Sequence, residues 1–523
     1  MGIPSYFSYI VKNHRTILKR LDKNTIKINN LYMDCNSIIY DAVYKIDFSK
    51  LDDTDVNVIC SNVFSKIDEY IALLQPDTNV FIAFDGVAPV AKLEQQRQRR
   101  YKSAYQNEVS KTIFKNAKPD AWNTAAITPG TEFMVTLNAK IHQRYTDPSK
   151  YGVKTLILSP SDIPGEGEHK LFEYIRNFPA QHDTKTTVIY GLDADLIMLS
   201  INHLPISKQI YLFRETPEFI KSIDSELEPN QTYLLDIPEL SATIMANMSN
   251  GVGTVNRVYD YIFICFFLGN DFMPHFPSIN IRTGGIDKML NAYKATIGPT
   301  EILTDGNKIY WKCVRKLVQF LANLEEANFK TETSLRDKRE NSRMPEKTPD
   351  DRMKKFEALP TYDRAAEKYI NPHNSNWQSR YYKTLFDVEI DETRKKQICT
   401  NYLEGLEWTM RYYTSGCPDW RWCYNYNYPP LLTDLIQYIP FYFETKFIYE
   451  NDRKPVTAMM QLCYVLPKQS LHMIPKKIHD KVRESGWYKS DCEFVWAYCR
   501  YFWECHVQLP EIDIDELEKL IHG

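Results

Sequence analysis

Carboxylate side chains recur in this sequence where short apolar runs end. Asp34 follows LYM directly, and Asp85 follows VFIAF. Carboxylates brought to one place repel one another strongly unless cations lie among them. Mg²⁺ suits such a site, because it is a hard ion that prefers oxygen ligands and keeps waters or phosphates as its remaining ligands. The candidate metal ligands and catalytic residues are Asp34, Asp85, Glu166, Glu168, Asp193, Asp195 and Asp271.

A single acid after a strand is more often a turn or helix-capping residue than a metal ligand. The spacing within the set argues against that explanation for all of them. Glu166 and Glu168 form an i, i+2 pair around one small residue, and Asp193 and Asp195 do the same. Capping does not require such pairs, so the combined pattern predicts a metal site.

A basic helical face follows Asp85 in the stretch DGVAPVAKLEQQRQRRYK. If the chain is helical from residue 91 onward, side chains at i, i+4, i+7 and i+8 share one face. Such faces are commonly just solvated. Here the face begins next to a candidate metal ligand, and arginine forks beside a lysine and an amide suit a phosphate. We therefore expect a pocket for a terminal phosphate at Lys92, Gln96, Arg99 and Arg100.

These side chains need structural elements that bring them together. Short apolar runs at residues 30–33, 79–84, 155–158, 187–190 and 209–213 alternate with longer helical patterns. That alternation is typical of βαβ units and a mostly parallel sheet flanked by helices. Open α/β sheets bind ligands at the carboxyl ends of their strands, so the acids after these runs should meet at one edge.

Length and composition suggest more than one structural region. The chain has 523 residues, of which 43% are hydrophobic and 25% charged, and its formal net charge is −3. A nucleic acid would therefore have to be met by a local basic patch. Charges of both signs nearly cancel after residue 325, where large apolar residues are few. We expect a core over 1–324, a charged flexible linker over 325–376, and a mainly helical second region over 377–523 that packs on the core.

Other classes find little support in the sequence. No apolar run approaches the ~20 residues of a membrane-spanning helix, and the first residues do not resemble a secretory signal. The 11 cysteines contain no CxxC pair, and no GxSxG or Walker pattern occurs. We expect reduced cysteines, no membrane association, and a cytoplasmic protein with the nucleus as the alternative.

Several longer blocks resemble the signature motifs of a known family. MGIPSYF, MDCNSIIY, FDGVAPVAKLEQQRQRR, PGEGEHKLFEYIR, YGLDADLIML and FFLGNDFMPHFPSINIRTGGIDKML are similar, in this order, to blocks of the Xrn-type 5′→3′ exoribonucleases. The resemblance continues in GLEWTMRYYTSGCPDWRWCYNYNYPPLLTDL and in QLCYVLPKQSLHMIP, and it ends in WECHVQLPEIDIDEL. It covers both homologous regions of that family.

The resemblance implies a PIN/flap-nuclease-like fold whose second region wraps the active site. It implies processive degradation of 5′-monophosphorylated single-stranded RNA, with release of nucleoside 5′-monophosphates. The acids named above would hold two Mg²⁺ ions, which Mn²⁺ can replace, and the basic face would hold the 5′-phosphate. A decapping enzyme would be the upstream functional partner, and we expect a monomer.

Two positions depart from the family pattern. Family members stack the first bases of RNA between a His and a Trp; here Tyr40 stands at the His position and Trp503 at the Trp position. Tyrosine stacks as well as histidine, so we expect stacking to survive. Val90 stands where the family usually has Arg, and one fewer cation there should weaken contact with RNA.

Two other functions fit parts of the sequence. A flap or structure-specific DNA nuclease would share the metal chemistry, but Pro-His-Phe-Pro at 274–277 stands where such enzymes begin a hairpin that grips duplex DNA. A catalytically silent RNA-binding scaffold on the same fold would have lost some acids, and here all of them are present. The exoribonuclease interpretation therefore ranks first.

Overall fold

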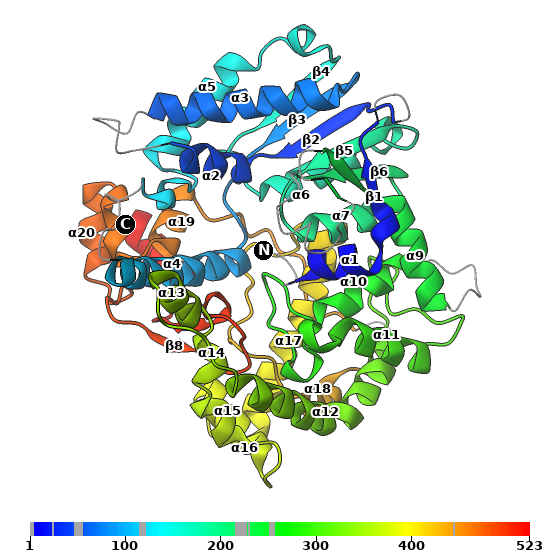
Figure 1. Ribbon diagram of the computed structural model, residues 1–523, viewed down its shortest axis with the longest axis vertical. Helices are drawn as coiled ribbons and strands as arrows, with labels where there is room; N and C mark the ends of the chain where they lie inside the picture. Colours follow the sequence, from blue (N-terminus) through cyan, green and yellow to red (C-terminus); the bar gives the residue numbers. More distant parts are fainter. Residues whose placement is uncertain are drawn as a thin grey trace.

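A central sheet organises the first half of the chain in the computed structural model, which describes residues 5–22, 26–46, 56–114, 122–214, 227–228, 231–249, 257–442 and 445–522. Its strand order is β1-β7-β6-β5-β2-β3-β4 (Figure 1). The strands are β1 Leu18–Arg20, β2 Asn30–Asp34, β3 Asn79–Ala83, β4 Thr155–Ser159, β5 Thr186–Tyr190, β6 Gln209–Phe213 and β7 Tyr233–Asp236. All pairs from β6 to β4 are parallel, and β7 pairs antiparallel with β6 and β1. The expected mostly parallel sheet is confirmed.

The two faces of the sheet belong to two hydrophobic cores. Successive side chains of a strand point to opposite faces, so Leu31 and Met33 of β2 enter one core and Tyr32 enters the other. Helices α2 Asn36–Tyr44, α3 Val56–Leu74 and α5 Glu132–Arg144 cover the first face. Helices α6 Gly167–Asn177, α7 Asp195–His203, α9 Ile237–Ser249 and α10 Val258–Phe266 cover the second (Figure 1).

The five predicted strand runs correspond to β2 through β6. The two strands β1 and β7 were not predicted. They are three and four residues long, and β1 lies at the edge of the sheet. Runs this short are too brief for alternation of polar and apolar residues to distinguish them from loops.

Helices dominate the rest of the chain. Trp408 and Tyr412 of α17 (Glu392–Thr414) are buried in the same core as β2 residue Tyr32, and α17 packs on α7 and α10, which cover that face of the sheet. The remaining helices of the first half are α1 Tyr6–Asn13, α4 Val90–Phe114 and α11 Gly285–Thr296. The later ones are α16 Trp377–Phe386, α17 Glu392–Thr414, α18 Leu432–Tyr438, α19 Ala458–Val465, α20 Lys476–Arg483 and α21 Ile514–His522. A small hairpin of β8 Glu493–Val495 and β9 His506–Gln508 joins them.

The charged segment 325–376 is helical and packed, so the prediction of a flexible linker was wrong. It contains the second half of α12 Trp311–Glu340, followed by α13 Pro349–Glu357, α14 Leu359–Tyr362 and α15 Ala365–Ile370. Arg336, Arg364 and Glu367 are buried, and Arg336 forms a two-pronged ion pair with Glu367. The prediction counted charges along the chain, whereas folding places opposite charges of neighbouring helices against each other.

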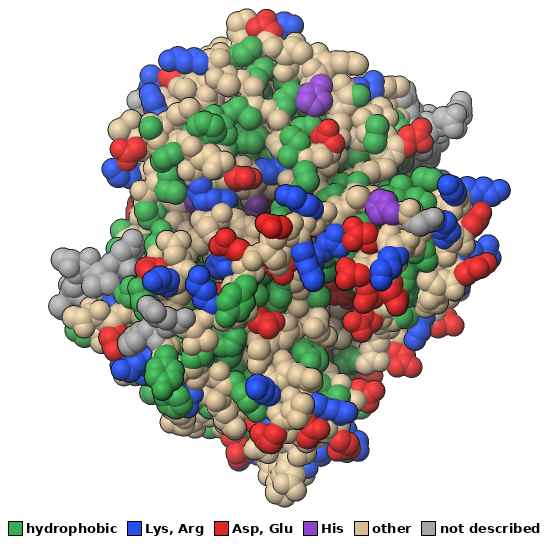
Figure 2. Space-filling view, turned by 180° about the vertical axis from the view of Figure 1, so that it is seen from behind, with side chains coloured by type: hydrophobic (Ala, Val, Ile, Leu, Met, Phe, Trp, Pro, Cys, Tyr) green, Lys and Arg blue, Asp and Glu red, His purple; other side chains and the backbone are tan. Residues whose placement is uncertain are grey.

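The surface is of mixed charge. On the face seen in Figure 2, Lys and Arg side chains lie among Asp and Glu side chains, with several acids gathered near the middle of the view. Such a face does not attract a polyanion as a whole. Within the described residues, no helix has both the length and the apolar character needed to cross a membrane.

Candidate metal centre and phosphate pocket

Parallel strands deliver the predicted acids to the same edge of the sheet. Asp34 is the last residue of β2, and Asp85 lies just beyond β3. Glu168 lies in the first turn of α6, after β4, and α7 begins at Asp195, after β5. Asp271 follows α10. Each is close enough to others for its charge to influence their pKa values, so the structure gathers Asp34, Asp85, Glu166, Glu168, Asp193, Asp195 and Asp271 in one cluster.

The N-terminus of α6 binds one of these acids and lies against another. The backbone N–H of Gly167 donates to Asp85 Oδ1 over 2.7 Å, and Asn36 Nδ2 donates to Asp85 Oδ2 over 2.5 Å. These two donors hold the side chain of Asp85 in place at the start of α6. A Cβ at Gly167 would lie 2.5 Å from Asp34 Oδ1, so only glycine lets the helix come this close to both acids.

Lys92 lies within the acid cluster. Its Nζ is 2.5 Å from Glu166 Oε2 and 2.5 Å from Asp271 Oδ2, and all three side chains are buried. Burial alone would favour a neutral amine, but Asp271 and Glu166 raise the pKa of Lys92 well above its ordinary value. Burial likewise opposes ionisation of Asp271, yet the ammonium of Lys92 outweighs it and lowers the pKa of that carboxyl. Lys92 therefore neutralises part of the cluster.

The cluster still has buried oxygens that await a partner. Asp34 Oδ1, Glu168 Oε2 and Asp195 Oδ1 have no hydrogen-bond partner among the described residues. Burial, reinforced by neighbouring carboxylates, raises the pKa of Asp34 and of Glu168 well above the ordinary range and that of Asp195 to about 7. Unpaired buried carboxylate oxygens are costly, and divalent cations would satisfy them. The residues present thus fit the expected Mg²⁺ ions.

Sequence reasoning missed three residues at this site. His169 can offer a nitrogen within 4.8 Å of ligand oxygens of Glu166 and Glu168, and its Nδ1 has no partner among the described residues. Its ring stacks on Tyr412 at 3.8 Å between centroids, and Tyr412 donates to Glu166 Oε1 over 2.9 Å. Tyr413 interacts with Asp195. His169 could have been found from the sequence, because it directly follows the candidate ligand Glu168. Nothing in the sequence links α17 with the acids.

Helix α4 carries the four predicted phosphate-binding residues, but Lys92 lies among the acids of the cluster and not beside Arg99 and Arg100. It begins at Val90, as the sequence pattern required, and Gln96 is buried while Arg99 and Arg100 are half-buried. Arg100 Nη2 donates to Thr128 Oγ1 over 2.5 Å, and its Nη1 has no partner among the described residues. Burial, together with the positive charge of Arg99, lowers the pKa of Arg100 to about 10. Two adjacent guanidiniums with an unpaired donor suit an anion, about 10–12 Å along the helix from Lys92.

The two predicted stacking residues lie on different elements. Tyr40 is half-buried on α2, close enough to Arg100 for an electrostatic interaction. Trp503 is 36% exposed and borders a cavity of about 290 Å³ that Asp271 also lines. Tyr501 stacks on Trp503 with ring planes 13° apart. That the two residues hold a base between them stays a prediction.

Val90 has a structural role in this chain. Its side chain is buried in a core formed with α19 and α21, and its N–H donates to the carbonyl of Trp420 over 3.0 Å. An arginine placed in this core would need a partner for its charge. The departure from the family pattern therefore goes with apolar packing at the start of α4.

Comparisons with known proteins identify the family of the chain. The family description "XRN 5′-3′ exonuclease N-terminus" matches residues 1–216, and "Xrn1 helical domain" matches 254–376 and 350–522. A "5′-3′ exoribonuclease 2 homolog" of Drosophila melanogaster is 25% identical and covers 100% of this chain and 71% of its own length. A "5′-3′ exoribonuclease 1" of Saccharomyces cerevisiae is 27% identical over 91% of this chain, which spans 40% of that protein. The solved catalytic core of Rad2 in complex with DNA substrate covers 69% of this chain and 85% of its own, at 14% identity and a TM-score of 0.35, a likeness too weak to carry an argument.

A mostly parallel sheet with carboxylates gathered at its carboxyl edge is compatible with divalent metal binding, and nucleases use such acids on phosphodiesters. The matches over both halves of the chain specify the kind of nuclease. The chain belongs to the Xrn family of 5′-3′ exoribonucleases.

Proposed function

We propose that this protein degrades 5′-monophosphorylated single-stranded RNA from its 5′ end, processively and with two divalent metal ions. The observation that carries the proposal is the pairing of two sites on one helix. At its start, α4 places Lys92 between two acids of the metal cluster, and two turns later it presents Arg99 and Arg100. One element thus joins a hydrolytic centre to an anion-binding group about one nucleotide away.

The acids of the cluster would hold Mg²⁺, or Mn²⁺ in its place. Bound by these residues, two such ions would supply an activated water and would offset the negative charge on the leaving 3′-oxygen. The protein's own part is to fix the carboxylates: Gly167 and Asn36 orient Asp85, and Tyr412 orients Glu166. Lys92 keeps Glu166 and Asp271 together and limits the repulsion within the cluster.

The basic face of α4 would select the RNA end. A 5′-monophosphate would gain charge-assisted hydrogen bonds from Arg99 and from Arg100, which Thr128 holds in place, whereas a cap or triphosphate should be too bulky to bind there. Capped messages would then require prior decapping, so we expect functional coupling to a decapping enzyme. We further propose that the protein acts as a monomer in the cytoplasm.

A time course on three matched RNAs tests the proposal. The RNAs carry a 5′-monophosphate, a 5′-hydroxyl or a cap, and the reaction contains Mg²⁺. We expect rapid release of nucleoside 5′-monophosphates from the monophosphorylated RNA alone and none after chelation of the metal. Internal cuts, or equal rates on all three RNAs, would contradict the exoribonuclease proposal. A labelled DNA flap in parallel distinguishes a structure-specific DNA nuclease.

A variant of the pocket sharpens the same experiment. Arg99→Gln removes one cation and keeps a polar side chain, so the preference for 5′-monophosphate over 5′-hydroxyl should fall by about 10-fold or more. Lys111→Gln is the matched control, because Lys111 is an exposed cation near the end of the same helix. An equal loss of rate on both RNA ends in Arg99→Gln would contradict the pocket assignment.

A further inference from the structure

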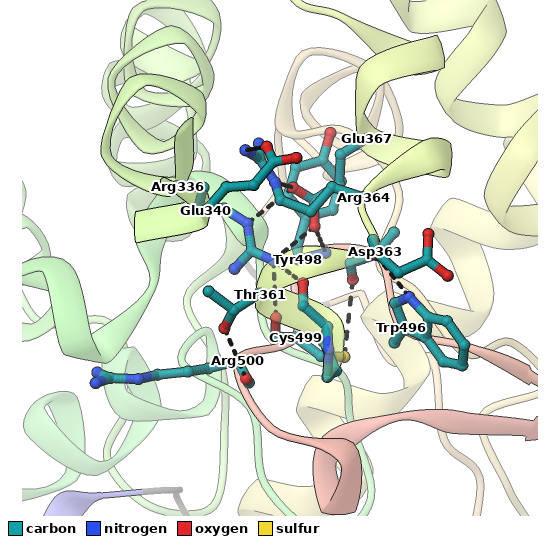
Figure 3. A network of polar contacts seen from close by, with 12 residues as sticks. Arg336, Glu340, Thr361, Asp363, Arg364, Glu367, Trp496, Tyr498, Cys499 and Arg500 are labelled. Carbon is teal, nitrogen blue, oxygen red and sulfur yellow. Dashed lines mark hydrogen bonds and ion pairs between the residues drawn. The ribbon is translucent and has the colours of Figure 1, made fainter. Parts of the chain in front are cut away.

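The packed charged segment has no part in the proposed chemistry, yet it contains an elaborate buried network (Figure 3). Glu367 of α15 accepts from Arg336 Nε over 2.8 Å and from Arg336 Nη2 over 2.6 Å. It also accepts from Arg364 Nε over 2.7 Å. Arg364 in turn pairs with Asp337 and Glu340 of α12. A buried ion cluster of this kind is weak evidence for stability, because desolvation offsets much of the attraction. The role of the network is therefore sought in the segments of the chain that it holds in place.

What the network holds is the loop between β8 and β9. The N–H of Tyr498 donates to Glu367 Oε1 over 2.7 Å, and Arg336 Nη2 donates to the carbonyl of Cys499 over 2.7 Å. Tyr498 has a φ of 63°, a left-handed conformation that bulky residues rarely adopt. A backbone of this kind persists only where its surroundings enforce it.

Two further contacts tie the same loop to the helices of the charged segment. Thr361 Oγ1 donates to the carbonyl of Arg500 over 3.2 Å, and Trp496 Nε1 donates to the carbonyl of Asp363 over 2.8 Å. The loop from 496 to 500 is thus attached to α14, α15 and the residues between them at several points (Figure 3). Its path is determined by the charged segment.

The loop leads directly to the predicted stacking residue. Trp503 lies three residues beyond Arg500, and Tyr501 between them stacks on its ring at 5.9 Å between centroids. The Arg282 guanidinium lies 5.8 Å from the centre of the Trp503 ring and pairs with Glu504. Glu504 Oε2 accepts from the N–H of Arg500 over 2.7 Å. Displacing Arg500 would therefore move both neighbours of the Trp503 ring.

We propose that Arg336, Arg364 and Glu367 are positioning residues that hold Trp503 in the orientation required to stack an RNA base. This inference rests on the proposed function, in which Trp503 contacts RNA. The charged segment acts as a brace between the first-half core and the stacking loop.

Arg336→Lys is the main test. Lysine keeps the positive charge but lacks the guanidinium fork, so it cannot bind both oxygens of Glu367 and the carbonyl of Cys499 together. We expect the KM for 5′-monophosphorylated single-stranded RNA to rise about 10-fold with kcat changed less than about 2-fold, as for lost binding that is shared by ground state and transition state. Arg352→Lys, at an exposed position of α13 in the same segment, is the matched control and should leave both constants unchanged.

A double-mutant cycle with Trp503→Ala separates positioning from general stability. If Arg336 acts through Trp503, Arg336→Lys should raise KM no further in the Trp503→Ala background, while its effect on the melting temperature is the same in both backgrounds. An equal rise of KM in both backgrounds would overturn the proposal. Thr361→Val, which removes only the contact to Arg500, should raise KM about 2- to 3-fold and provides a variant that folds if Arg336→Lys does not.

The same double-mutant cycle can be measured by RNA binding in the absence of hydrolysis. The dissociation constant of a fluorescein-labelled 5′-monophosphorylated oligouridylate, measured by anisotropy with Ca²⁺ in place of Mg²⁺, should show the same non-additivity. A coupled dissociation constant without any hydrolysis in Mg²⁺ would refute the proposed function and leave the positioning role standing. Additive effects of Arg336→Lys and Trp503→Ala on the dissociation constant, in an enzyme that hydrolyses RNA, would refute the positioning role and leave the proposed function standing.

Discussion

At the scale of single residues, the acids of the cluster differ in how firmly neighbouring groups hold them. Lys92 lies between Glu166 and Asp271, and backbone and amide donors bind Asp85. Asp193 differs from the others because it is exposed. An exposed carboxylate can be removed with little effect on folding, whereas removing Lys92 would leave two buried carboxylates without their cation.

Asp193→Asn should therefore abolish hydrolysis without unfolding the protein. We expect the rate on 5′-monophosphorylated RNA to fall at least about 100-fold, because a charged ligand of the metals is lost. The free energy of unfolding without metal should stay within about 0.5 kcal/mol of wild type. Thermal melting with and without Mg²⁺ checks the cause: Mg²⁺ should raise the melting temperature of the wild type and raise that of the variant less. An unchanged Mg²⁺ response would remove Asp193 from the metal site.

At the scale of elements, helices α6 and α7 are joined by a hydrogen bond that forms only when the imidazole of His203 is neutral. His203 at the end of α7 is 1% exposed and donates from Nδ1 to the carbonyl of Leu199 over 2.7 Å. Its Nε2 lies 3.0 Å from Arg176 Nη1 of α6 and must accept, since arginine can only donate. A protonated imidazole has no acceptor to offer, so α6 and α7 are joined through the neutral ring.

This contact predicts a loss of stability in acid. Burial, together with the charge of Arg176, lowers the pKa of His203 from 6.5 to about 3. The unfolded chain therefore binds one more proton than the folded chain between these values, and the free energy of unfolding falls as the pH drops below 6.5, by at most about 1.4 kcal/mol per pH unit for this residue. Urea unfolding of His203→Gln and wild type between pH 4.5 and 7 measures it. The variant, though less stable at pH 7, should show the smaller slope, and parallel slopes would exclude His203 as the titrating group.

At the scale of the whole molecule, the two halves of the chain share one core. The largest hydrophobic cluster extends from Tyr6 of α1 through the sheet to Trp408 and Tyr412 of α17. Glu325 of α12 accepts from the backbone N–H groups of Leu432 and Thr433 at the start of α18. The second half therefore completes the hydrophobic core of the first.

A fragment ending at residue 324 should not fold on its own. It would expose the apolar surface that α17 covers and would lose the hydrogen bond from Tyr412 to Glu166. We expect the full chain to show one cooperative thermal transition by circular dichroism, and fragment 1–324 to lack a cooperative transition or to aggregate. Co-expression with 325–523 should restore a soluble complex. A fragment 1–324 that melts cooperatively would show that the first half is an independent domain.

The sequence by itself determined the sheet, the acids and the basic helix, because each rests on local pattern. Apolar runs of strand length specify β2 to β6, and the acids that follow them reach one edge since parallel strands end on the same side. The helical spacing of Gln96 and Arg99 likewise needs no knowledge of the rest of the chain. Each of these features can be recognised from a short stretch of the first half of the chain.

Tertiary structure alone decided which distant groups complete the site and what the charged segment does. Tyr412 reaches Glu166 across 246 positions of the sequence, and Arg336 reaches Cys499 across 163. No local pattern encodes such pairs, because the same charged residue type can be solvated in an extended chain or paired in a core. Whether a charged run becomes a linker or a buried brace depends on which oppositely charged side chains folding brings against it.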